Sequence, residues 1–284
     1  MMTIQWFPGH MAKAMRMMQD AVKQVDCVIY VLDSRAVMSC MNPKFDELIK
    51  NKPILYVLNN CDMVDSNEIK KWRDWFVKRG KSVVVADSIG GKQRKLIVEK
   101  LKEINKAVVE KFASKGANKI IRAMVIGVPN TGKSTLINSL CQSKRAITGN
   151  RAGVTRGKQW VSLAEGVELL DTPGNLPPAF EEQKRALHLA FLGSIKEDIL
   201  HIDELAIEMI NFCREYNAKA FMERYKLQEF SDDNLEVFDA ISKNRGYLLG
   251  KKGYDYERTE RAIIDDFQKQ KLGKLMLDRA EDWA

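Results

Sequence analysis

The sequence is poor in cysteine, and no two cysteines form a C-x-x-C pair. The five that occur are an odd number, which argues against a disulfide framework and against a zinc site, so we expect reduced thiols. Long hydrophobic runs are also missing. The longest extends from Cys27 to Leu32, whereas a membrane helix needs about 20 apolar residues. Since the amino terminus carries no signal-peptide pattern either, we predict a cytoplasmic protein.

The composition is typical of a folded protein with about two domains. The chain has 284 residues, of which 45% are hydrophobic and 30% charged, enough to bury a core. Its net charge of +8 is uneven: the residues up to Lys184 carry 30 basic and 18 acidic side chains, and the rest carry 16 and 20. The densest stretch, Lys92 to Arg122, has ten basic and three acidic residues, and we call it the basic segment. It suits a polyanionic partner such as nucleic acid, although a solvated lysine-rich helix face has the same composition.

The spacing of apolar residues predicts two regions of different architecture. Short β-branched runs are typical of strands buried in a parallel sheet and occur at residues 25–33, 54–59, 82–87 and 120–127. Helical stretches near 67–78 and 93–114 lie between them, which favours an α/β, doubly wound sheet. After about Pro178 only helical patterns follow, at 186–195, 203–215, 219–225, 235–242 and 257–271. We predict a sheet domain over residues 1–178 and a small all-helical domain over residues 179–284.

The most specific motif is a glycine-rich loop, Gly127-Val128-Pro129-Asn130-Thr131-Gly132-Lys133-Ser134, which fits G-x-x-x-x-G-K-[ST]. It follows a predicted strand and precedes a helical run that begins at Thr135, which is the context the motif requires. Backbone N–H groups of such a loop surround a phosphate, and the helix terminus adds its dipole. We call residues 127–134 the phosphate loop. Asn130 to Thr135 are expected to contact the nucleotide, with Lys133 at the β and γ phosphates and Ser134 on Mg²⁺.

A second motif for the phosphate side is the D-x-x-G tetrapeptide Asp171-Thr172-Pro173-Gly174, at the end of a strand-like run. Asp171 would join the magnesium shell, and the Gly174 N–H would reach the γ-phosphate. Between the two motifs, Thr155 lies in a polar segment. It would complete the Mg²⁺ shell, or it is an ordinary surface threonine.

The base-reading element precedes the phosphate loop. A guanine reader needs a carboxylate for the ring N1–H and the exocyclic amine, which GTPases take from an N-K-x-D tetrapeptide, and nothing after Gly174 fits that pattern. Upstream, Asn59-Asn60-Cys61-Asp62 ends a predicted strand, and Ser88 lies in the loop after the next one. We call residues 59–62 the base-reading tetrapeptide. Its position predicts a circular permutation, which folding tolerates because domain termini often lie close together.

The permuted order, the opening Trp6-Phe7-Pro8-Gly9-His10-Met11 and the two phosphate-side motifs resemble the circularly permuted GTPases. The resemblance covers nearly the whole chain, including a helical tail around Ala240 to Gly246. It implies a circularly permuted P-loop GTPase domain that hydrolyses GTP to GDP, coupled to late assembly of the large (50S) ribosomal subunit. The implied partners are that subunit or its precursor and rRNA, with no membrane and no DNA.

The chain departs from this family at residues that matter for binding and hydrolysis. Where members usually carry a lysine whose stem covers the guanine, this chain has the shorter Asn60, so we expect weaker affinity with guanine preference kept by Asp62. Asn175 stands where Ras-like enzymes place a water-orienting glutamine, and slow intrinsic turnover is expected. His10 matches a family histidine proposed to position water, or it is structural. Asn130 resembles the asparagine that holds K⁺ in potassium-activated GTPases. Alternatively, its side chain only hydrogen-bonds the backbone of its own loop.

Three classes of function stay open. The first, which we favour, is an RNA-binding GTPase activated by ribosomal particles. In support, basic and aromatic residues typical of contacts to single-stranded RNA are interleaved in the helical region: Lys243, Arg245, Tyr247, Lys251, Lys252, Tyr254 and Tyr256. The second is a P-loop kinase or ATPase, which would need no guanine carboxylate. The third is a GTP-sensing module with negligible hydrolysis.

Overall fold

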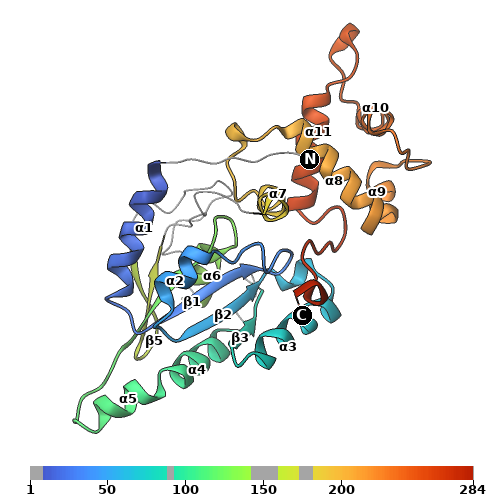
Figure 1. The fold of residues 1–284 in the computed structure, drawn as a ribbon. Coiled ribbons are helices and arrows are strands. Elements are labelled where there is room, and N and C mark those ends of the chain that lie inside the picture. The colour runs from blue at the N-terminus through green and yellow to red at the C-terminus, as the bar shows by residue number, and fades with distance from the viewer. Residues whose placement is uncertain (1–8, 88–92, 142–158, 173–181, 284) are drawn as a thin grey trace. The chain divides into compact units, whose positions relative to one another are not determined.

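The computed structural model describes residues 9–87, 93–141, 159–172 and 182–283, with side chains in the first helix from residue 15 onward. The described residues form two compact units (Figure 1). One contains the described residues up to 172 together with the last ones from Met276, and we call it the sheet unit. The other, the helical unit, is Glu182–Leu275.

The strands of the sheet unit lie in the order β3-β2-β1-β4-β6-β5, and all neighbours are parallel except β5 and β6. Their bounds are β1 Cys27–Asp33, β2 Ile54–Asn59, β3 Ser82–Val85, β4 Ile121–Ile126, β5 Gln159–Ala164 and β6 Val167–Asp171. The predicted mainly parallel, doubly wound sheet is therefore confirmed. Strand β5 was not predicted. It is an antiparallel edge strand with Trp160 40% exposed, so it lacks the fully apolar run of a buried strand.

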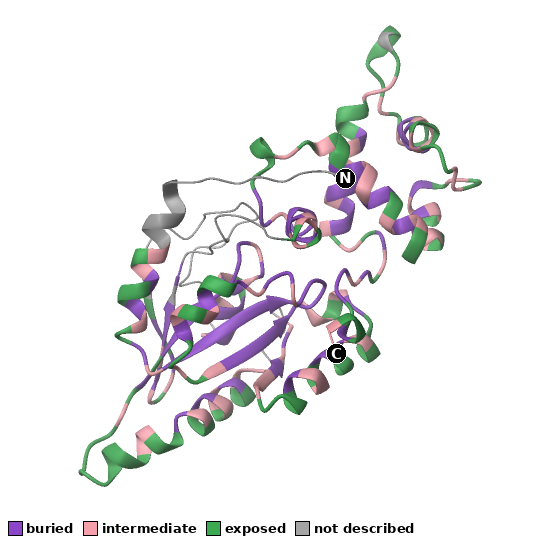
Figure 2. Cartoon of the chain, viewed as in Figure 1, coloured by how far each residue is buried: buried purple, intermediate pink, exposed green. Residues whose placement is uncertain are grey.

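Helices cover both faces of the sheet. Their bounds are α1 Gly9–Val22, α2 Pro43–Ile49, α3 Ser66–Lys78, α4 Arg94–Ile104, α5 Lys106–Ala113 and α6 Lys133–Leu140. On one face, apolar side chains of α4 and α6 such as Leu101 and Ile137 join the strands in one buried core. On the other, the ring of Tyr30 packs against Phe45 of α2. The central strands β1 and β2 are accordingly buried along almost their whole length, as Figure 2 shows.

The helix predicted over 93–114 is two helices, because Asn105 interrupts it. This buried residue turns its side chain back onto the chain, and its Nδ2 donates to the Leu101 carbonyl at 2.8 Å. Such a bond competes with the helical pattern. The second helix, α5, buries no residue and precedes the amino-terminal end of β4. It thus lies away from the arrowheads of β1 and β2, at the opposite end of the sheet (Figure 1).

The helical unit contains α7 Gln183–Phe191, α8 Ile202–Tyr216, α9 Ala218–Tyr225, α10 Asn234–Arg245 and α11 Tyr256–Gln268. A buried carboxylate, Asp266, joins α11 to α9 and α10. It accepts hydrogen bonds from Arg224 Nε at 2.7 Å and from Tyr225 Oη at 3.1 Å, and it pairs with Arg245 at 3.3 Å. Burial favours the neutral form of Asp266, but its contacts with Arg224 and Lys271 lower its pKa.

The compact units differ from the predicted ranges at the carboxyl terminus. The prediction assigned residues 179–284 to a helical domain, whereas the chain from Met276 packs with the sheet unit. Trp72 Nε1 donates to the Asp278 carbonyl there at 3.2 Å. This return involves residues 206 positions apart, so no local pattern could have indicated it.

The five cysteines are reduced thiols, as the sequence predicted. Burial raises the pKa of the Cys27 and Cys213 thiols to about 12, so both stay protonated and unreactive. In the described part of the chain, no helix is both long and apolar enough to cross a membrane.

Candidate nucleotide site

The predicted site elements meet at one edge of the sheet. Strands β1, β2, β3, β4 and β6 run parallel, so their carboxyl ends share that edge. Asp33 of β1 pairs with Asn59 of β2, and Val125 of β4 pairs with Asp171 of β6. In doubly wound sheets this edge is where ligands bind. The fold therefore brings together the base-reading tetrapeptide, the phosphate loop and the start of the D-x-x-G motif.

The phosphate loop has a conformation that only glycine permits at Gly127. This residue has a φ of +153°, and a Cβ placed on it would lie 2.4 Å from the Val31 carbonyl oxygen. Gly132, with φ 81°, caps the start of α6 in the left-handed region. Lys133 is 7% exposed and donates through Nζ to the Val128 carbonyl at 2.8 Å. The loop is thus closed on itself, and its lysine is already held inside the turn.

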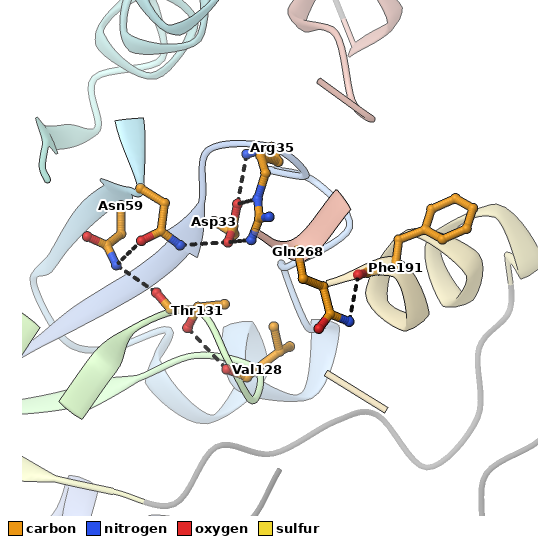
Figure 3. Close-up of polar contacts among 8 residues, drawn as sticks. Asp33, Arg35, Asn59, Val128, Thr131, Phe191 and Gln268 are labelled. Atoms are coloured by element: carbon orange, nitrogen blue, oxygen red, sulfur yellow. Dashed lines mark hydrogen bonds and ion pairs between the residues drawn. The ribbon is translucent and has the colours of Figure 1, made fainter. Parts of the chain in front are cut away.

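The base-reading tetrapeptide is tied directly to the phosphate loop. Buried Asn59 donates through Nδ2 to the Thr131 carbonyl at 2.8 Å, a bond that joins positions 72 apart in sequence (Figure 3). Next to it, the Cys61 N–H donates to the Ala86 carbonyl just beyond β3 at 3.2 Å. The tetrapeptide is therefore held between the phosphate loop and the end of β3.

A buried ion pair next to this tetrapeptide had no predicted role. The Arg35 guanidinium donates to Asp33 through Nε at 2.9 Å and Nη2 at 2.8 Å (Figure 3). Burial disfavours the charged guanidinium, but the Asp33 carboxylate outweighs it and raises the pKa of Arg35. Asp33 also accepts a hydrogen bond from Asn60 Nδ2 at 2.8 Å. The side chain of Asn60, whose φ is 58°, is therefore directed to Asp33.

The remaining predicted residues are placed as follows. Asp62 is exposed on the short 3-10 helix Cys61–Met63. Asn130 is half-buried with φ 61°, and Ser134 and Thr135 lie in the first turn of α6, half-buried and exposed respectively. Thr172, which follows Asp171, donates through Oγ1 to the Val125 carbonyl at 2.6 Å and so fixes the start of the D-x-x-G motif beside β4.

Several predicted residues lie outside the described part of the chain. These are Ser88, Thr155, Gly174 and Asn175. For His10 and Asp171 the structure describes only the backbone, in α1 and β6 respectively.

Comparison with known proteins decides the family. A family described as "50S ribosome-binding GTPase" matches residues 122–237. Ribosome biogenesis GTPase A of Bacillus cereus is 41% identical over 284 residues, which is 100% of this chain and 96% of that protein. The chain belongs to the ribosome biogenesis GTPase A family. The member from Thermotoga maritima is 32% identical over 98% of this chain and 95% of its own length.

A solved structure agrees with this membership. The crystal structure of GNP-bound YlqF from T. maritima superposes with a TM-score of 0.66 at 27% identity, over 95% of this chain and 99% of that one. As a member of the ribosome biogenesis GTPase A family, the chain is a GTPase with a circularly permuted P-loop fold and a helical region after it. The predicted family, fold class and enzyme class are confirmed, and the kinase or ATPase alternative is rejected.

The contacts of Asn60 give a prediction for nucleotide affinity. Asn60→Lys should tighten guanine nucleotide binding by about tenfold, because a stem of four methylenes can cover the ring at about 0.8 kcal/mol for each one fully buried. Burial of about two of the four methylenes accounts for the tenfold gain, whereas the left-handed backbone at this position costs folding stability equally in the free and the bound protein. Equilibrium binding of a fluorescent GDP measures the affinity, and the hydrolysis rate at saturating GTP should stay unchanged. An unaltered affinity would mean that another side chain already covers the base.

Proposed function

We propose that this GTPase acts in the cytoplasm on the large ribosomal subunit or its precursor and contacts rRNA. The observation that carries the proposal is the full-length similarity to ribosome biogenesis GTPase A of B. cereus. A second class of relative supports it, since mitochondrial ribosome-associated GTPase 1 of Mus musculus is 32% identical over 97% of this chain.

On the phosphate side, Lys133 neutralises the β and γ phosphates and the residues from Asn130 to Thr135 line them. The closed phosphate loop with its buried lysine supports this role. Ser134, Thr155 and Asp171 hold Mg²⁺. Mg²⁺ suits such a site because it takes few protein ligands and completes its shell with phosphates and water.

On the base side, Asp62 accepts hydrogen bonds from the guanine N1–H and amine, and Ser88 contacts the base through its backbone. Asn59 holds the tetrapeptide against the phosphate loop, a role that its bond to the Thr131 carbonyl supports. This arrangement fits a guanine nucleotide because a buried or charged hydrogen-bonding group discriminates strongly against a base that leaves it unpaired.

Hydrolysis is slow in the isolated protein. His10 and Asn175 orient the attacking water, the Gly174 N–H binds the γ-phosphate, and Thr155 would join the Mg²⁺ shell when the γ-phosphate is present. Asn130 would hold K⁺, which would supply the positive charge that an arginine finger supplies in other GTPases. Asn130 lies in the phosphate loop, is half-buried and has a left-handed φ of 61°.

The role of Asn130 predicts a dependence on the monovalent cation. Hydrolysis should be about tenfold or more faster in KCl than in NaCl at equal ionic strength, because the ion supplies the positive charge of an arginine finger. Asn130→Asp keeps the shape of the side chain and should change this preference, whereas Asn138→Asp, in the same region but beyond the phosphate loop, should leave it. Steady-state phosphate release measures the rates. Equal rates in the two salts would reject a cation at Asn130.

As the region that contacts rRNA, we favour the basic segment over the helical region. Exposed lysines of the basic segment, among them Lys102 of α4, Lys111 of α5 and Lys115 just after α5, present positive charge to solvent. In the helical unit, by contrast, Arg245 pairs with Asp266 and Arg258 stacks 4.3 Å from the centre of the Tyr247 ring. These basic side chains already have partners within their own unit, so the basic segment carries more of the affinity.

Turnover with ribosomal particles tests the proposed function. Purified precursors of the large subunit should raise the hydrolysis rate well above that of the protein alone, whereas small subunits at the same concentration should not. A rate that large-subunit particles leave unchanged would contradict the proposal and favour a GTP-sensing module with negligible hydrolysis.

A further inference from the structure

The last described residues, Met276–Trp283, form a segment that packs on the sheet unit, and we call it the terminal segment. Leu277 and Asp278 are buried, at 4% and 3% exposure. Besides the bond from Trp72 to Asp278, Trp75 Nε1 donates to the Trp283 carbonyl at 2.8 Å. Both tryptophans belong to α3, so the terminal segment is bound along that helix over most of its length.

The buried end of the terminal segment holds the loop that follows β1. The Asp278 carboxylate accepts two hydrogen bonds from Ser39, one from its N–H at 2.7 Å and one from its Oγ at 3.0 Å. The Leu277 N–H donates to the Arg35 carbonyl at 2.6 Å. The terminal segment thus fixes residues 35 and 39 of this loop in the sheet unit.

The same loop supports the base-reading tetrapeptide. Arg35, whose carbonyl the terminal segment binds, holds Asp33 with its guanidinium. Asp33 in turn accepts the hydrogen bond from Asn60. Buried or half-buried polar contacts therefore lead from the terminal segment, which binds residues 35 and 39 of the loop, through Arg35 and Asp33 to the tetrapeptide that carries Asp62.

We propose that the terminal segment positions the base-reading tetrapeptide, with Asp278 as the positioning residue. Its carboxylate holds Ser39 and thereby the loop whose Arg35 reaches the tetrapeptide through Asp33 and Asn60. Its effect falls on the base side of the site and not on the phosphate loop. Loss of Asp278 therefore lowers the affinity for the guanine base and speeds nucleotide release, whereas bound GTP is hydrolysed at the normal rate. The inference takes guanine nucleotide binding as given by the family and is independent of any ribosomal partner.

Release of a fluorescent GDP from the full-length protein tests this inference. Asp278→Ala should speed release about tenfold, and Asp278→Asn, which keeps one acceptor, should speed it less. The rate of hydrolysis at saturating GTP should stay within about twofold. The matched control is Glu281→Ala on the same segment, which removes only an exposed ion pair to Lys71 and should leave release unchanged.

Two further readouts separate positioning from a general loss of stability. Inosine diphosphate lacks the exocyclic amine that Asp62 reads, so Asp278→Ala should narrow the difference in affinity between GDP and inosine diphosphate. A general loss of stability would lower both affinities equally, and that result would overturn the proposal. In addition, Asn60→Ala should add little to Asp278→Ala, since both act on one series of contacts. Additive effects on release would overturn the proposal as well.

A milder variant keeps the test decisive if Asp278→Ala fails to fold. Ser39→Ala removes one of the two hydrogen bonds to Asp278 and leaves the terminal segment intact. It should speed GDP release by about threefold without lowering the melting temperature by more than a few degrees. Unchanged release in both Ser39→Ala and Asp278→Asn would contradict the proposal.

Discussion

Asp62→Asn should lower the affinity for GTP by about 10- to 100-fold and create affinity for xanthosine triphosphate. The carboxylate accepts from the guanine N1–H and amine, and losing it leaves polar groups unpaired at about 1 to 3 kcal/mol. Xanthine carries a carbonyl in place of the amine, which the new amide N–H₂ can bind. Because Asp62 is exposed on a short 3-10 helix and is not part of the core, the substitution should leave the fold intact.

Competition binding with GTP, ATP and xanthosine triphosphate measures this exchange. Asp74→Asn is the matched control, since Asp74 is an acidic residue of α3 whose ion pair to Arg73 is exposed. The control should bind all three nucleotides like the unmodified protein. Equal binding of ATP and GTP by the unmodified protein would contradict the assignment of Asp62.

Charge reversal in the basic segment has the second large effect. The triple variant Lys102→Glu, Lys111→Glu, Lys115→Glu should weaken binding to large-subunit particles by roughly 10- to 100-fold at about 0.1 M salt. Each phosphate contact releases counterions when the protein binds. Losing three contacts should therefore also reduce the magnitude of the slope of log affinity against log salt by about three. The loss should be the same in the GTP-analogue and GDP states, because α5 precedes the amino end of β4 while the nucleotide site lies at the carboxyl edge.

A second triple variant controls for net charge. Lys70→Glu, Arg73→Glu and Lys78→Glu make the same change on α3, where all three side chains are exposed. This variant should keep most of the affinity and its salt dependence. Equal losses in the two variants would mean that particles respond to the total charge and not to the basic segment.

The sheet and the position of the site could be predicted because both depend on local signals. Buried parallel strands are continuous apolar runs, and the carboxyl ends of such strands share one edge, so motifs that end strands must meet there. The phosphate loop follows the same logic, since Gly127 is fixed by its close approach to Val31. Strand β5 was missed because an exposed edge strand has no such run.

The contacts that hold the base-reading tetrapeptide could not be predicted, because they depend on residues far apart in sequence. Ser39 and Asp278 are 239 positions apart, and neither belongs to a motif. Asp33 and Arg35 form a visible pattern at the end of β1, yet the sequence does not reveal that Asp33 binds Asn60. The break at Asn105 between α4 and α5 was only partly predictable. An asparagine in a helical pattern interrupts the helix when its side chain is buried and hydrogen-bonds the backbone, and burial is not visible in the sequence.

Co-sedimentation with large-subunit precursors in different nucleotide states tests the central claim most directly. The account predicts that the protein sediments with the particles in the presence of a non-hydrolysable GTP analogue and largely dissociates in GDP. Thr155→Ala should abolish that difference while keeping the basal, salt-sensitive binding, since an equilibrium shifts only through different affinities of its two states. Sedimentation that is the same in both nucleotides for the unmodified protein would contradict a GTP-dependent action on the large subunit.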